Sequence, residues 1–238
     1  MDKHYTVTTG TKSRRRDNKS GEKKILLRCT ALLLAVVLLS GILLAASSTR
    51  DARILHDLGL FNGTNKGYEL NRSINRAEAA TMLLRLLGEE RTASSEDWRH
   101  PFVDLPDWAE QNIGYMFVQG LTNGMTEYRF CPKIPCTLQM YATFVLRALG
   151  YSEECGDFTY DEALDLAGAL DLIPEGLSGE EDFLRDYAVA VSLRALAAPL
   201  KDGSMSLFDK LVECGAISEE AASRHQELSL FAAADSCR

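Results

Sequence analysis

The stretch from Phe102 to Tyr151 decides the fold, and it reads FVDLPDWAEQNIGYMFVQGLTNGMTEYRFCPKIPCTLQMYATFVLRALGY. Its first half has apolar residues at the spacing of an amphipathic helix: Trp108, Ala109, Ile113, Met116 and Phe117. Its last part predicts a second helix with an apolar face of Met140, Tyr141, Phe144, Val145 and Leu149. Because such a helix–loop–helix unit has too little core to be stable alone, we expect further copies of it.

Polar and glycine residues mark the ends of these two helices. Asp104 is expected to cap the first helix, because its side chain can accept from free backbone N–H groups. Gly120 is expected to end that helix, and Asn123-Gly124 predicts a turn. Thr137 is expected to cap the second helix. The loop between them contains Phe-x-Pro, which we interpret as packing residues.

Copies of the second helix lie on both sides of this stretch. The motif FVLRALG around Arg147 is similar to MLLRLLG around Arg85 and to VSLRALA around Arg194. The arginines are 62 and 47 residues apart, so the repeat is irregular. The residues nine positions before these arginines are Leu138, Arg76 and Arg185.

The order of these motifs resembles the S-layer homology (SLH) family of cell-surface proteins in Gram-positive bacteria. The chain has F-x-D, W-A, G-L-T-N-G, F-x-P and a capped helix in that family's order. INRAE at residues 74–78 is similar to the family's I-T-R-A-E signature, with Asn75 in place of Thr. The last copy resembles the closing module of clostridial-type SLH regions. The resemblance covers about residues 51–217 and implies an all-α fold of three helix–loop–helix modules, with their second helices in a pseudo-threefold bundle.

The repeats and the composition shifts divide the chain into segments. We expect a disordered basic N-terminus over 1–24, a signal peptide or membrane anchor over 25–48, a truncated SLH module over 49–90, a second module over 101–151, a more diverged third module over 157–217, and a C-terminal helix or tail over 218–238. Further helices are predicted over 49–59, 75–87, 158–173, 183–197 and 205–217. Asn75 and Glu78 form the pattern of a capping box. Residues 88–100 read as a polar linker.

The apolar run from Ile25 to Ala46 follows a basic flank. Its uninterrupted part suits the core of a signal peptide, and the small residues after it suit cleavage. Counted from Ile25, it also approaches the roughly 20 residues that span a bilayer. A cleaved signal and an uncleaved membrane anchor are both open. In either case the positive-inside rule places the rest of the chain outside the membrane.

Charge is divided unevenly along the 238 residues. Residues 1–28 hold 9 basic and 3 acidic side chains, whereas the remainder holds 17 basic and 31 acidic ones. An acidic body argues against nucleic acid as a partner. An anionic partner must therefore be held by a local arginine site and not by a broad basic face.

Cysteine and histidine patterns point to no metal site and no enzyme. Cys131 and Cys136 are separated by four residues, which is too wide for a zinc knuckle; a disulfide and two free thiols are both open. The four histidines are scattered, and none lies in a metalloprotease motif. There is no phosphate loop or dinucleotide fingerprint. We expect a non-enzymatic protein that uses no cofactor.

The site residues are implied by the resemblance. In the SLH family, grooves between adjacent modules bind a secondary cell-wall polysaccharide, often through a pyruvylated sugar. By position, the implied glycan-binding residues are Arg76, Asp104, Trp108, Gly120, Gly124 and Arg185. A guanidinium group can bind a sugar carboxylate with two donors, and an aromatic ring can cover a sugar face. The alternatives are that Trp108 only fills the core and that the glycines only permit turns.

Two departures from the family pattern limit the number of sites. Leu138 stands where the second signature arginine belongs, and Met140 where its glutamate belongs. We therefore expect one or two competent grooves. The expected function is non-covalent attachment to the cell wall outside the membrane, and the alternative is an envelope scaffold whose modules no longer bind glycan.

Overall fold

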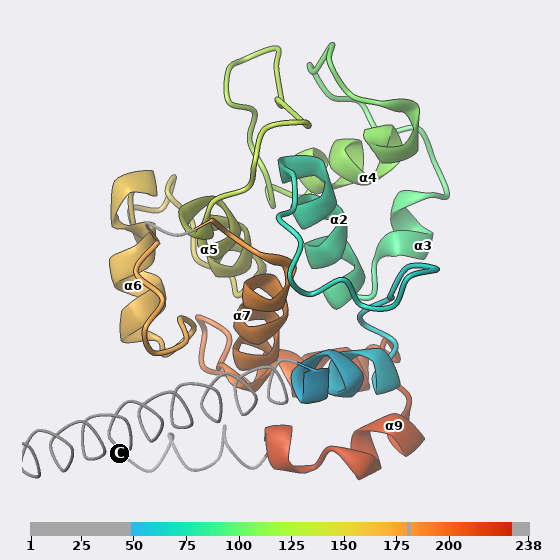
Figure 1. Cartoon of the computed structure of the whole chain (residues 1–238). Coiled ribbons are helices and arrows are strands. Elements are labelled where there is room, and N and C mark those ends of the chain that lie inside the picture. The colour runs from blue at the N-terminus through green and yellow to red at the C-terminus, as the bar shows by residue number, and fades with distance from the viewer. Residues whose placement is uncertain (1–48, 180–181, 230–238) are drawn as a thin grey trace, which may run out of the picture. The chain divides into compact units, whose positions relative to one another are not determined.

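The computed structural model describes residues 49–179 and 182–229, which belong to the unit that spans residues 48–238. Within these ranges the chain is helical, and its only β contacts are isolated bridges (Figure 1). The predicted helical fold class is therefore confirmed. No described helix has the length and apolar character needed to cross a bilayer. The predictions for 1–24 and 25–48 concern residues outside the described ranges.

The helices follow the repeats of the sequence. Residues 49–57 are helical, followed by α2 (Arg76–Leu86), α3 (Glu90–Ala93), α4 (Asp107–Val118), α5 (Leu138–Ala148), the 3-10 turn η1 (Tyr160–Glu162), α6 (Ala163–Ala169), α7 (Arg185–Ala197), α8 (Leu207–Glu213) and α9 (Glu219–Arg224). We refer to residues 49–90, 101–151 and 157–217 as the first, second and third repeats. Arg76, Leu138 and Arg185 are each the first residue of a helix.

The predicted linker over residues 88–100 is wrong in part, because α3 lies within it. Two local contacts lie at the ends of this short helix. The Arg85 guanidinium binds the Glu90 carboxylate with two donors, and Nε lies 2.7 Å from Oε2. The Trp98 indole N–H donates to the carbonyl of Ala93 at 2.8 Å. Each contact joins residues five positions apart, a spacing that the reading of this segment as polar did not take into account.

Helices α2, α5 and α7 pack against one another in pairs and form the centre of the fold (Figure 1). The extended segments that precede them also pair. The N–H of Arg76 donates to Ile134 O at 3.0 Å, and the N–H of Arg185 donates to Arg72 O at 2.9 Å. The three helices therefore begin at one shared end of the molecule, and their first side chains lie near loops of other repeats.

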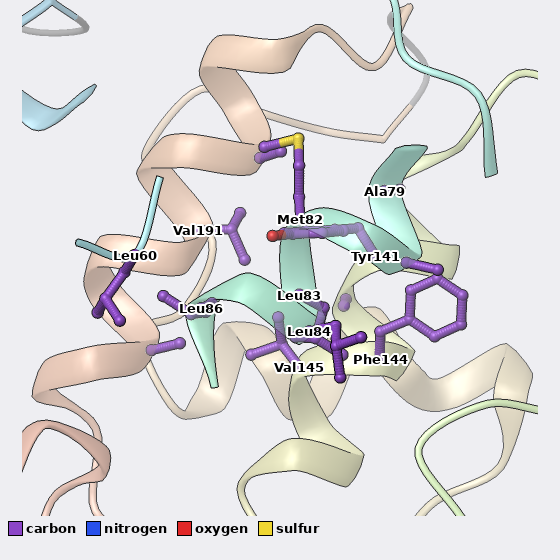
Figure 2. Close-up of a cluster of buried hydrophobic side chains, with 14 of the residues drawn as sticks. Leu60, Ala79, Met82, Leu83, Leu84, Leu86, Tyr141, Phe144, Val145 and Val191 are labelled. Carbon is purple, nitrogen blue, oxygen red and sulfur yellow. The ribbon is translucent and has the colours of Figure 1, made fainter. Parts of the chain in front are cut away.

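The core lies between these three helices. Figure 2 shows Leu83 and Leu84 of α2 beside Phe144 and Val145 of α5, with Val191 of α7 in the same cluster. All five side chains are buried. Since each helix supplies only part of this apolar surface, burial joins the repeats into one cooperative core.

Cap residues explain where the central helices begin. Asn75 Oδ1 accepts from the N–H of Glu78 at 2.9 Å, and Glu78 Oε2 accepts from the N–H of Asn75 at 3.0 Å. The predicted capping box is therefore confirmed. Thr137 Oγ1 accepts from the N–H of Met140 at 3.2 Å, which confirms the second predicted cap. The prediction for Asp104 is wrong, because Pro106 occupies the N-cap position of α4.

Candidate ligand-binding groove

A groove of about 300 Å³ opens beside the N-terminal end of α2. The start of α2, the loop after α4, one face of α5 and the segment after α5 contribute to it. Its lining residues are Arg76, Asn123, Gly124, Met125, Met140, Thr143, Phe144, Arg147, Glu153 and Tyr160. We refer to it as the Arg76 groove.

Arg76 is a buried cation at the base of this groove, with only 5% of its surface exposed. Its Nη2 donates to Asn123 O at 2.7 Å, and its Nε donates to Phe130 O at 3.1 Å. The guanidinium carbon lies 4.6 Å from the centre of the Phe130 ring and 5.1 Å from that of Phe144. Burial lowers the pKa of Arg76, and no carboxylate of the described residues pairs with it.

Arg147 and Glu153 form an ion pair that also lines the groove. Arg147 Nε donates to Glu153 Oε2 at 2.9 Å, and Nη2 donates to the other carboxylate oxygen. The side-chain amide nitrogen of Asn123 donates to Thr122 O at 3.1 Å. The side-chain amide oxygen of Asn123 accepts from Arg147 Nη2 at 3.2 Å. Burial raises the pKa of Glu153, but the hydrogen bonds and charge of Arg147 more than offset this, so the pKa lies below its ordinary value.

Two of the implied site residues are glycines that the backbone requires. A Cβ atom on Gly124 would lie 2.2 Å from Thr126 O and 2.6 Å from the Phe102 ring, so no other residue fits without movement. Gly120 has φ +70° directly after the last turn of α4, a conformation that side chains disfavour. Gly124 also lines the Arg76 groove, whereas Gly120 does not.

Asp104 lies outside the groove but positions one of its components. Its carboxylate accepts from the N–H of Phe130 at 2.9 Å and from the N–H of Cys131 at 3.0 Å. Since the Phe130 carbonyl and ring both contact Arg76, Asp104 holds the loop on which the guanidinium rests. Its contacts are those of a positioning residue.

Trp108 is 57% exposed near the start of α4 and does not line the Arg76 groove. The alternative in which this ring fills the core is therefore wrong. A glycan contact at Trp108 would therefore lie outside the Arg76 groove.

Arg185 repeats the environment of Arg76 at another junction. It is 6% exposed, its Nη2 donates to Asn62 O at 2.9 Å, and it lies over the Phe61 ring at 4.8 Å. Its Nε is buried without a hydrogen-bond partner among the described residues. Burial lowers the pKa of Arg185. Asn62 precedes Gly63 as Asn123 precedes Gly124, so the same loop type receives both arginines.

The third junction lacks a buried arginine. Leu138 occupies the corresponding helix start and is 2% exposed. The third repeat arginine, Arg194, still forms an ion pair, with its Nη1 2.8 Å from Asp171 Oδ1. Two of the three junctions therefore bury a cation.

Comparisons with known proteins point to the bacterial surface. No protein-family model matches the chain. It is 28% identical over 109 residues to the middle cell wall protein of Brevibacillus brevis, covering 44% of this chain and 10% of that protein. It is 27% identical over 148 residues to a cell surface protein of Thermoanaerobacter kivui, covering 58% of this chain and 19% of that protein. An endoglucanase of a Bacillus species is 37% identical over 81 residues, covering 34% of this chain and 8% of the enzyme.

The chain resembles parts of Gram-positive surface proteins. It spans less than a fifth of the length of these curated relatives, so the similarity concerns a segment of each and not the whole protein.

Several groove residues were not identified from the sequence as site residues. Thr143, Glu153 and Tyr160 were not singled out as candidates, and Arg147 was used only as a marker of the repeat. One signal was available: Arg85 and Arg147 recur in the same motif, and each is followed within six residues by the glutamate that binds it.

The thiols of the second repeat are free. Cys131 and Cys136 form no disulfide, and burial raises the pKa of Cys136 to about 12. Within the described part of the chain, no three His, Cys, Asp or Glu side chains gather in a way that could hold a metal ion.

Proposed function

We propose that this chain is a cell-surface protein that attaches non-covalently to the bacterial cell wall through three SLH modules. Its ligand is an anionic secondary cell-wall polysaccharide, for which a pyruvylated sugar is one suitable chemistry. The observation that carries the proposal is Arg76, a buried cation beside a groove with no carboxylate partner in the described chain. An unpaired buried charge is costly, and an anionic ligand would offset that cost.

The groove also offers surfaces that suit a sugar. Met125 and Tyr160 line it and remain 48% and 43% exposed, so their apolar faces are available to a pyranose ring. Arg76 Nη1 forms no hydrogen bond to the described residues, and it is the donor proposed to bind the ligand carboxylate. The relatives named for the cell wall and the cell surface support the same location outside the membrane. Residues 25–48 would direct export as a signal peptide or as a membrane anchor.

The proposal contains no catalytic step and no cofactor. The other charged side chains of the groove, Arg147 and Glu153, are paired with each other and not presented as a nucleophile and base. The matched segment of the endoglucanase is 8% of that enzyme, so its activity is not transferred to this chain.

A second candidate function is an envelope scaffold whose modules no longer bind glycan. One observation favours it. Arg76 already donates to two backbone carbonyls and lies over two rings, so the residue could serve only to join the first two repeats. Leu138, at the equivalent position, shows that a helix start of this fold can do without an arginine.

Co-sedimentation with purified wall sacculi separates these two functions. The full chain in mild detergent should bind intact sacculi and lose binding once the polysaccharide is chemically stripped. Arg76→Ala should weaken binding roughly ten- to a hundredfold, because a hydrogen bond to a charged group contributes about 1.5–3 kcal/mol. Arg76→Lys should recover only part of it, since Lys lacks the planar fork. Equal binding of stripped and intact sacculi would leave the scaffold as the function.

A further inference from the structure

We infer that Glu153 sets the charge of the ligand that the Arg76 groove accepts: a singly charged carboxylate, in preference to a doubly charged phosphate monoester. This inference rests on the proposed function, because it assumes that the groove binds an anionic sugar. It assigns to Glu153 the role of a specificity-determining residue.

The charges in the groove lead to this conclusion. Its charged lining residues are Arg76, Arg147 and Glu153, which together carry one net positive charge. Both Nε and Nη2 of Arg147 bind the carboxylate of Glu153, so the charge of Arg147 is already compensated. Only the charge of Arg76 is left for a ligand. One negative charge on the ligand therefore neutralises the groove, whereas two would leave it with a net negative charge.

The position of Glu153 also acts against a second negative charge. Its side chain is 27% exposed and lines the same groove, so it is close to any occupant. The hydrogen bonds and charge of Arg147 keep the pKa of Glu153 below its ordinary value despite the effect of burial, so the carboxylate is ionised at neutral pH. A dianion would be attracted by Arg76 but repelled by this carboxylate, which is a common way to reject an unwanted ligand.

The repeats supply a matched control for this ion pair. Arg85 and Glu90 form the corresponding pair near Arg185, with Nε and Nη2 of the guanidinium donating to the two carboxylate oxygens. Glu90→Gln breaks that pair without changing the charge in the Arg76 groove.

The test compares two probe sugars that differ in charge. One is methyl glucuronoside, with a single carboxylate; the other is methyl glucoside with a phosphate on its primary hydroxyl, which carries a charge of about −1.5 to −2 at neutral pH. Amide chemical-shift titrations of the full chain in mild detergent would follow Gly124, which lines the groove. Wild type should bind the glucuronoside more tightly than the phosphate.

Glu153→Gln should shift the preference toward the phosphate by about tenfold, because it raises the net charge of the groove by one unit. Arg147→Gln combined with Glu153→Gln restores the original net charge, and it should restore the original preference. Glu90→Gln should leave the preference unchanged. If Glu153→Gln alone is poorly folded, Arg147→Gln keeps the test decisive, because it lowers the net charge of the groove by one unit and should shift the preference further toward the glucuronoside.

Other outcomes overturn the inference. They are a wild-type preference for the phosphate, an unchanged ratio in Glu153→Gln, an altered ratio in the double variant, or no shift of Gly124 with either sugar. Binding of the same proteins to sacculi then shows whether only this inference fails or the proposed function fails as well. If binding to sacculi still depends on Arg76, only the role of Glu153 is wrong; if it does not, the proposed function fails as well.

Discussion

At the scale of single residues, the buried side chains of Arg76 and Arg185 lie where a positive charge is unfavourable. Arg76 and Arg185 each occupy the first position of a helix, where the helix dipole is positive and a cation is unfavourable. Each is also removed from water, which lowers its pKa. Backbone carbonyls and aromatic rings offset part of this cost. Neither arginine pairs with a carboxylate of the described residues, and the anionic ligand proposed above would offset the remaining cost.

Arg76→Leu tests that explanation, because it copies the residue found at Leu138. The variant loses two hydrogen bonds to backbone carbonyls, but it also removes the cost of burying an unpaired charge. We expect the free energy of unfolding to change by less than about 1 kcal/mol, since these effects oppose each other. Binding to sacculi should be lost. Urea denaturation and co-sedimentation would measure the two effects on the same sample.

A loss of stability above about 3 kcal/mol in this variant would indicate that Arg76 is chiefly a structural residue. Leu138→Ala provides the comparison. That side chain is 2% exposed, so its truncation should cost about 2–5 kcal/mol, while binding by the remaining folded protein should be unchanged.

At the scale of secondary structure, the sequence predicted features whose causes are local. The capping box of Asn75 and Glu78 and the Thr137 cap depend on residues within one turn, and all of these were predicted correctly. Asp104 was assigned to the wrong N–H groups, because its partners lie 26 and 27 residues away in the chain. Chain spacing alone cannot show which distant backbone a carboxylate will contact.

The groove could be predicted only in part for the same reason. Arg76 and Gly124 were implied by the family resemblance, and the structure places both in its lining. Glu153 and Tyr160 come from segments beyond α5, and no local pattern connects them to α2. Trp108 shows the opposite error: its helical spacing predicts a buried face, yet it is 57% exposed.

Acid should weaken the contacts at the ends of the central helices. Burial raises the pKa of Glu78 and of Glu153, but their arginine partners, Arg72 and Arg147, more than offset this, so both pKa values lie below the ordinary 4.5. A carboxyl group whose pKa is lower in the folded chain stabilises it above the unfolded pKa. That contribution is lost as the pH falls below 4.5 and through the lower folded pKa.

The measurement is the free energy of unfolding as a function of pH. Wild type should lose stability between about pH 5 and pH 3. The combination of Glu78→Gln and Glu153→Gln should be less stable than wild type at neutral pH and should show a shallower decline over that interval. An equally steep decline in the double variant would assign the acid sensitivity to other carboxylates.

At the scale of the whole molecule, the repeats share one core, and side chains of one repeat contact loops of another at their junctions. Arg76 of the first repeat reaches a loop of the second, and Arg185 of the third reaches a loop of the first. Helices α2, α5 and α7 each pack on the other two. A binding groove at a junction therefore exists only when neighbouring repeats are folded together. The ligand binding proposed above would therefore be coupled to the stability of the whole unit.

Ending the chain at residue 156, which removes the third repeat and α9, should therefore unfold what is left. The fragment 49–156 keeps α2 and α5, but it loses α7 and with it the buried Val189 and Val191. The apolar faces of two helices would then be exposed to water, and hydrophobic burial is what offsets the entropy cost of ordering them. We expect a helical fragment with fluctuating packing, a broad thermal transition and a weak near-UV signal.

The control for this deletion is the fragment 49–217, which lacks α9 but keeps all three central helices. It should melt cooperatively, at a lower temperature than the full chain because the buried side chains of Ala221 and Leu228 are missing. A sharp transition with native-like near-UV signal in the fragment 49–156 would contradict the shared core. The first two repeats would then be a stable unit by themselves, with an Arg76 groove that lacks Tyr160.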